Sequence, residues 1–132
     1  FSDADFAGDR GDLKSTSGVF RALVGPHCFG PLCGQAKRQT ATGHSTVEAE
    51  LAACNHGLRT AGTLALALWE PIFRIEMEID LYQDSQATAR IRHTGKAPTL
   101  RHITRVHQLF ATWLRDRKCS NTFSWKTTTP RL

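Results

Sequence analysis

Apolar side chains alternate with polar ones along residues 75–82 (IEMEIDLY). This period of two predicts a β-strand with one face packed and one face polar. Residues 18–24 (GVFRALV) are rich in branched and aromatic side chains and end at Gly25–Pro26, so they predict a second strand. Residues 123–126 (FSWK) repeat the alternation and predict a last strand.

Two further strands are expected from weaker patterns. Residues 1–12 predict the end of a strand that runs into a charged turn, with Gly8 and Gly11 as its flexible points. Residues 32–39 predict an antiparallel neighbour of the second strand, beginning after a break at Gly30–Pro31. Together the patterns place several short strands in the first third of the chain.

A long amphipathic helix is predicted from Ser45 to Pro71, where the proline marks its end. Its apolar stripe recurs at steps of three and four residues and consists of Val47, Leu51, Cys54, Leu58, Ala61, Leu64, Leu68 and Ile72. Asp84–Ser85 is expected to cap a short helix that runs to Ile91, and Thr99 a later helix with a stripe from Leu100 to Trp113.

The order of strands, helix, strand, helices and strand predicts an α/β fold with a mixed central sheet and packed helices. The 132 residues, 40% hydrophobic and 22% charged, suit one folded domain over residues 1–132. No run approaches the roughly 18 apolar residues of a spanning helix, so we expect no membrane partner. The four cysteines are irregularly spaced, which favours free thiols over a zinc site.

The formal net charge of +5 favours a polyanionic partner such as a nucleic acid without identifying it. Three carboxylates stand where a sheet and a helix could gather them, namely Asp3, Glu50 and Asp84. Such oxygen ligands suit hard divalent cations. Glu48 and Glu50 lie about 200° apart around a helix, so only one can face a given site. Asp3 and Asp5 share one strand face and stay indistinguishable. Spacing alone favours surface carboxylates and helix caps.

Two motifs change this interpretation. Residues 2–9 (SDADFAGD), followed by residues 14–18 (KSTSG), closely resemble the opening of RNase H domains from copia-type (Pseudoviridae) LTR retrotransposon polyproteins. Residues 48–52 (EAELA), residues 81–86 (LYQDSQ) and residues 101–103 (RHI) resemble later motifs of that family, in the same order. The resemblance covers almost the whole chain, is strongest over residues 2–18, and implies an RNase H-like fold.

The resemblance also implies the chemistry. It selects Asp3, Glu50 and Asp84 as catalytic residues and as ligands of two Mg²⁺ ions, with Mn²⁺ as a substitute. The implied reaction is cleavage of the RNA strand of an RNA·DNA hybrid during reverse transcription, leaving a 5′-phosphate and a 3′-hydroxyl. The resemblance implies that the DNA strand is not cleaved, because the enzyme recognises the 2′-hydroxyl groups of the RNA strand. Contacts to nucleic acid are expected from Ser85, Gln86, Arg101 and Arg105.

The implied context is a longer polyprotein. We expect the domain to be truncated at both ends, with an incomplete first strand and a fourth metal-binding acid in a helix after Leu132. The expected partners are the hybrid and the reverse transcriptase domain of the same polyprotein, in a cytoplasmic virus-like particle or the nucleus. Phe6 replaces the family's usual tryptophan, and residues 33–35 (CGQ) replace a strand segment that carries another.

Two alternatives remain open. One is a catalytically inactive RNase H-fold remnant that binds nucleic acid or acts as a scaffold. The other is a different nuclease of the same fold, such as an integrase or a resolvase, which would cut duplex DNA instead of a hybrid.

Overall fold

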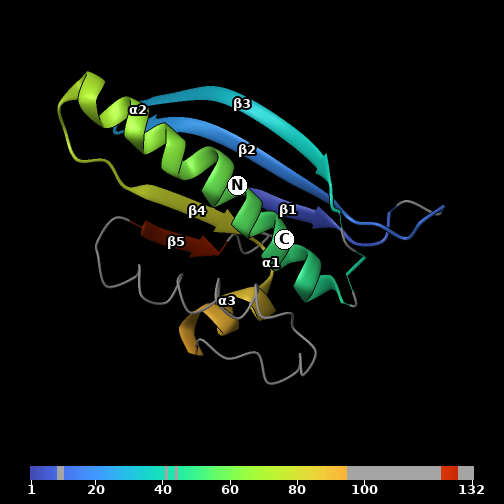
Figure 1. Cartoon of the computed structure of the whole chain (residues 1–132). Coiled ribbons are helices and arrows are strands. Elements are labelled where there is room, and N and C mark those ends of the chain that lie inside the picture. Colours follow the sequence, from blue (N-terminus) through green and yellow to red (C-terminus); the bar gives the residue numbers. More distant parts are fainter. Residues whose placement is uncertain (9–10, 41, 44, 95–122, 128–132) are drawn as a thin grey trace.

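The computed structural model describes residues 1–8, 11–40, 42–43, 45–94 and 123–127. The elements, in chain order, are β1 (Ser2–Asp5), β2 (Thr16–Gly25), β3 (Cys28–Arg38), α1 (Thr46–Gly57), η1 (Leu58–Gly62), α2 (Thr63–Phe73), β4 (Ile79–Gln83), α3 (Gln86–Thr94) and β5 (Phe123–Thr127). Figure 1 shows α1, η1 and α2 as one continuous helical rod along the strands. No helix among the described residues is long and apolar enough to cross a bilayer.

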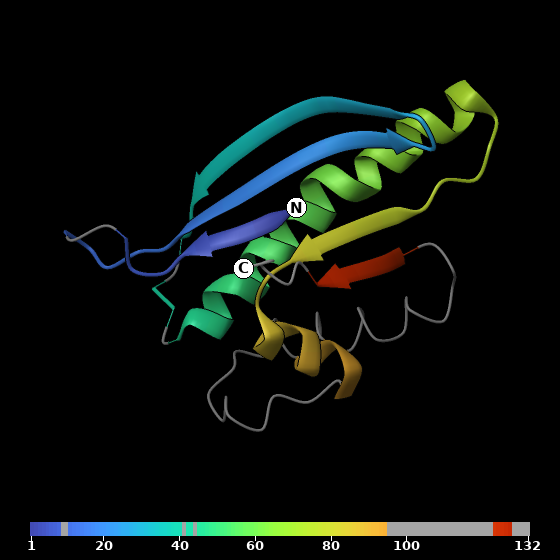
Figure 2. The same cartoon turned by 180° about the vertical axis from the view of Figure 1, so that it is seen from behind.

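The predicted α/β class is confirmed, but the described strands form two separate sheets. β1, β2 and β3 make an antiparallel sheet in that order, and β4 pairs in parallel with β5. We expected one mixed central sheet. β4 lies beside β1 and runs in the same direction (Figure 2), and the Phe1 ring stacks on Tyr82 with centroids 4.7 Å apart. No ladder of hydrogen bonds joins this four-residue β1 to β4 in the described chain.

Strand β3 begins earlier than predicted. Gly30 and Pro31 pair with β2 instead of breaking the chain, and the register shifts between Arg21 and Ala22. A proline can sit here because β3 is an edge strand of its sheet and one side of its backbone needs no partner. The extra residue is absorbed as a bulge.

The long helix differs from its prediction in one respect that matters for packing. Residues 58–62 form a π-helical turn, in which the Thr63 backbone N–H donates to the Leu58 carbonyl five residues back. The extra residue rotates the following helix by about 100° relative to the preceding stripe. Leu58, at the start of the turn, is buried, whereas the predicted stripe residues after it, Leu64, Leu68 and Ile72, are exposed.

The end of this helix and the start of β4 also differ from their predicted positions. The helix passes Pro71, whose missing N–H falls in the last turn, and it ends where Arg74 adopts a left-handed conformation with φ of 54°. Residues 75–78 are not a strand, because the chain folds back on the helix and the Met77 N–H donates to Glu70 Oε1 at 3.2 Å. β4 keeps only the second half of the alternating segment.

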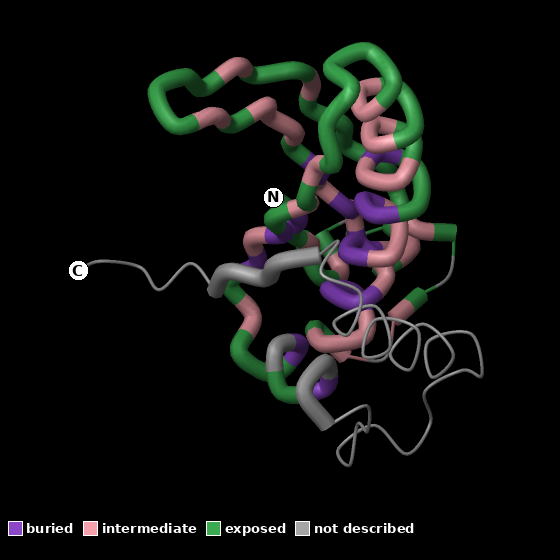
Figure 3. The backbone as a smooth tube through the Cα atoms, turned by 90° about the vertical axis from the view of Figure 1, so that its left-hand side faces the viewer, coloured by how far each residue is buried: buried purple, intermediate pink, exposed green. Residues whose placement is uncertain are grey.

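The core lies between α1 and the strands. The buried residues, purple in Figure 3, are most numerous in α1 and occur also in β1, β2, η1, β4 and α3. The buried apolar side chains are Val19, Ala49, Leu51, Ala53, Cys54, Leu58, Ala61, Leu81 and Ile91. Trp69 is half-buried, and its ring stacks on that of Phe73 with the ring centroids 5.5 Å apart. The predicted helix over residues 99–113 and the nucleic-acid contacts Arg101 and Arg105 lie outside the described residues.

Residues 14–18, the second of the two motifs, connect the strands to the helix through hydrogen bonds. Ser15 is fully buried, and its hydroxyl accepts from the Ala7 N–H at 3.2 Å. Ser17 is also buried, and its hydroxyl accepts from Gln39 Nε2 at 2.9 Å. The same Gln39 nitrogen donates to the carbonyl of Ala49 in α1 at 2.9 Å. These bonds fix β2, the end of β3 and α1 to one another near the start of the helix.

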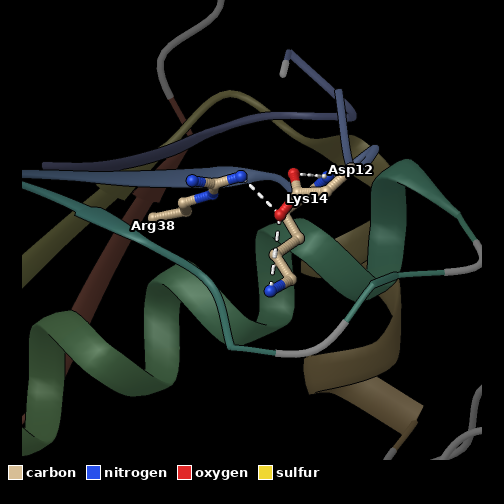
Figure 4. A network of polar contacts seen from close by, with 3 residues as sticks. All are labelled: Asp12, Lys14 and Arg38. Carbon is tan, nitrogen blue, oxygen red and sulfur yellow. Dashed lines mark hydrogen bonds and ion pairs between the residues drawn. The ribbon is translucent and has the colours of Figure 1, made fainter. Parts of the chain in front are cut away.

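A polar cluster fastens the turn before β2 to the end of β3 (Figure 4). The Arg38 guanidinium contacts the Asp12 carboxylate, and Lys14 Nζ lies 3.4 Å from the same Oδ2 atom. The hydrogen bond from Arg38 is the main reason why the pKa of Asp12 lies below its ordinary value. The cluster is at the surface, so it holds the loop more than it stabilises the core.

Candidate metal centre

Three separate elements bring three carboxylates to one point. Asp3 lies on β1 opposite Gly18, Glu50 lies in the second turn of α1, and Asp84 directly follows β4. One carboxylate oxygen from each lies within 4.8 Å of the others. Asp3 and Asp84 are exposed, while Glu50 is 5% exposed. The residues that the sequence selected as metal ligands are therefore brought together.

The local structure places each acid for a simple reason. Ser45 caps α1, with its hydroxyl accepting from the Glu48 N–H at 3.2 Å, and this bond fixes where the helix begins. Glu50 then falls on the face that packs against β1. Asp84 follows the last residue of β4, beside the neighbouring β1 that carries Asp3.

The neighbouring acids do not join the group. Asp5, two residues beyond Asp3, lies against Gly8, where an added Cβ would collide with its carboxylate. Glu48 lines a separate cavity of about 240 Å³ together with Lys37 and His56. The helical geometry that separates Glu48 from Glu50 is thus seen directly.

The electrostatics of the site centre on Glu50. Burial raises the pKa of its carboxyl above the ordinary value, and the negative charges of Asp3 and Asp84 raise it further. The hydrogen bond from Gln83 acts in the opposite direction and lowers the pKa. Among the described residues, no salt bridge neutralises any of the three carboxylates. A cluster of this kind is stabilised by a cation.

Gln83 is the residue that sequence reasoning missed. It is 6% exposed, and its Nε2 donates to Glu50 Oε2 at 3.0 Å and to the Glu50 carbonyl at 3.4 Å. A signal existed in the sequence, because Gln83 continues the packed face of the strand after Ile79 and Leu81. A buried amide in that position needs hydrogen-bond partners.

The centre opens onto a cavity of about 690 Å³. Asp3, Gln83 and Asp84 line one part of it, and most of the rest is formed by small and aromatic residues of β1, β2, β3 and β4, among them Gly18, Phe20, Gly34 and Tyr82. Two of the three carboxylates are therefore reachable from solvent. An ion bound there could keep free positions for water or a ligand.

The two predicted contacts next to Asp84 have different surroundings. Ser85 caps α3, and its hydroxyl accepts from the Thr88 N–H at 3.3 Å and from Thr88 Oγ1 at 3.0 Å. Gln86 is exposed in the first turn of the same helix. Ser85 thus has a structural role already, while Gln86 is exposed and can contact a ligand.

The donor set fits a divalent cation. The three oxygens within 4.8 Å come from one buried and two exposed carboxylates, and hard cations prefer such ligands over nitrogen or sulfur. Cys28, Cys33 and Cys54 lie outside this group. Comparisons with models of protein families, with curated proteins and with solved structures gave no match to this chain.

Proposed function

We propose that the chain is the RNase H domain of a copia-type retrotransposon polyprotein, with an RNase H-like fold. Its activity is metal-dependent cleavage of the RNA strand of an RNA·DNA hybrid. One observation carries the proposal, the approach of ligand oxygens from Asp3, Glu50 and Asp84 to within 4.8 Å. The same three positions are the ones that the motif resemblance assigns to the metals.

The roles of the residues follow from their surroundings. Asp3, Glu50 and Asp84 hold two Mg²⁺ ions, or Mn²⁺ in their place, which supply activation of water and stabilisation of the leaving oxygen. Exposed Asp3 and Asp84 present their oxygens to the open cavity, where a phosphodiester can enter. Glu50 stays buried and anchors the group from the helix side.

Substrate binding is proposed for the surface around the centre. The net charge of +5 favours a polyanion. Gln86 lies two residues after Asp84 and is exposed, so it can reach a sugar of the RNA strand, with Ser85 beside it. Arg101 and Arg105 are proposed to bind phosphates of the hybrid. The reverse transcriptase domain of the polyprotein is the proposed protein partner, in a cytoplasmic virus-like particle or the nucleus.

Digestion of a labelled RNA·DNA hybrid with Mg²⁺ tests the proposal. Because the resemblance places a fourth acid after Leu132, the protein is assayed both as the present chain and with its following residues. We expect hybrid cleavage that is lost in Asp3→Asn and kept in Asp5→Asn, the matched exposed carboxylate on the same strand. Cleavage that survives Asp3→Asn unchanged contradicts the proposal.

The same assay separates the alternatives. Cutting of duplex DNA but not of the hybrid would identify a different nuclease of this fold. Hybrid binding without cleavage in every form, measured by fluorescence anisotropy, would identify a non-catalytic nucleic-acid-binding module.

A further inference from the structure

We propose that Gln83 is a positioning residue for the metal centre, which holds the Glu50 carboxylate in the orientation that a cation requires. The inference rests on the proposed function in that it takes Asp3, Glu50 and Asp84 as metal ligands. It adds a residue that has no ligand role and acts through Glu50.

The contact itself is specific. Gln83 Nε2 lies 3.0 Å from Glu50 Oε2 and 3.4 Å from the carbonyl oxygen of the same residue. One amide group therefore binds both the side chain and the backbone of Glu50. Both side chains are buried, at 6% and 5% exposure, so water competes little for these bonds.

Its position in the fold links two ligands. Gln83 is the last residue of β4, and Asp84 follows it directly. The end of this strand thus supplies one ligand from Asp84 and fixes another through Gln83. A shift of α1 relative to β4 would change the distance from Glu50 to Asp84, and the Gln83 bonds resist that shift.

The chemistry of an amide suits this task. A lysine at position 83 would neutralise Glu50 and compete with the cation, and a carboxylate would add repulsion. A neutral donor orients the Glu50 carboxylate and leaves its charge available to the ion. Partners of metal ligands that act in this way typically change metal affinity by about 10- to 100-fold when they are removed.

The test compares Gln83→Met with Gln39→Met. Gln39 is the matched control because its amide also binds the backbone of α1, at Ala49, but contacts no carboxylate among the described residues. Binding of Mn²⁺ to the full chain is measured by electron paramagnetic resonance of the free ion, and the free energy of unfolding is measured in parallel. Gln83→Asn, which keeps the amide but shortens its reach, is measured too.

We expect Gln83→Met and Gln83→Asn to weaken Mn²⁺ binding by about tenfold or more, and Gln39→Met to change it less than threefold at a comparable loss of stability. Should Gln83→Met fail to fold, Gln83→Asn alone decides. Wild-type affinity in the folded position-83 variants, or an equal loss in Gln39→Met, overturns the inference.

The outcomes also distinguish this inference from the proposed function. Weakened Mn²⁺ binding in a chain that never cleaves the hybrid supports the positioning role and removes the nuclease assignment. Hybrid cleavage with unchanged Mn²⁺ affinity in the Gln83 variants does the reverse. A wild-type chain that binds no Mn²⁺ overturns both.

Discussion

Gly57 of α1 lies directly against Val19 of β2, so that a Cβ added to the glycine would lie 3.2 Å from Val19 Cγ2. The absence of a side chain at this point lets the helix approach the sheet closely. Glu50 lies seven residues earlier on the same helix, about two turns away. The depth at which the helix docks therefore influences how near Glu50 comes to Asp3.

Gly57→Val is expected to lower the free energy of unfolding by about 1–3 kcal/mol, because the added methyl groups overpack the contact with Val19. Gly34→Val is the control, since a Cβ there meets its nearest atoms, in Phe20 and Val19, at 3.9 and 4.0 Å. Urea denaturation measures both. A similar change in the two variants would contradict the importance of this contact.

The π-helical turn supports a second prediction. Leu58 is 1% exposed and Leu68 is 56% exposed, although both belong to the stripe predicted from the sequence. Leu58→Ala should cost about 2–4 kcal/mol by leaving a cavity. Leu68→Ala should change stability by less than about 0.5 kcal/mol. Chemical denaturation distinguishes this from an uninterrupted helix, in which both substitutions would be costly.

Local patterns in the sequence predicted the elements but not their exact phase. The three-and-four spacing of apolar residues located the long helix, yet no local signal marked the π-helical turn that exposes Leu64 and Leu68. The alternation over residues 75–82 predicted a strand that begins four residues before β4, because it cannot show that the Met77 N–H binds Glu70 of the preceding helix. The period of apolar residues shows which face of a helix or strand can be buried, and the packing of the folded chain decides which face is buried.

The candidate site was predictable only in part. Spacing could exclude Glu48 once Glu50 was chosen, because the two point to different sides of a helix. It could not separate Asp3 from Asp5, since both share one strand face. The motif resemblance made that choice. The alternation places Gln83 on the packed face of its strand, but its role was missed because its partner, Glu50, is known only from the folded chain.

The left-handed end of α2 gives a third prediction. Arg74 has φ of 54°, a conformation that costs a residue with a Cβ about 1 kcal/mol. Arg74→Gly should raise the free energy of unfolding by about 0.5–1 kcal/mol. Arg74→Ala keeps the Cβ and serves as the control, with no gain expected. Equal thermal unfolding midpoints for the two variants would argue against strain at this position.

The buried Glu50 makes a prediction about pH. Burial raises the pKa of its carboxyl above the ordinary 4.5. At a pH between 4.5 and the raised pKa, the folded chain therefore keeps a proton that the unfolded chain has released. The unfolded state then binds fewer protons, and the free energy of unfolding falls as pH rises through this window. Above the raised pKa the folded chain carries the full cost of the buried charge, and well below pH 4.5 that cost is absent.

Glu50→Gln removes the titrating group while keeping an oxygen that can accept from Gln83. At pH 7 we expect the free energy of unfolding of the variant to be higher than that of the wild type by about 1 kcal/mol. This is the lower end of the range for the cost of burying a polar group whose hydrogen bonds are incomplete. The two proteins should converge in acid. Addition of Mg²⁺ should raise the melting temperature of the wild type and leave the variant almost unchanged, because the ion stabilises only the state that binds it. A variant that is less stable than the wild type at pH 7 without metal would mean that the Glu50 charge is already compensated within the fold, and the centre would then have no electrostatic need for a cation.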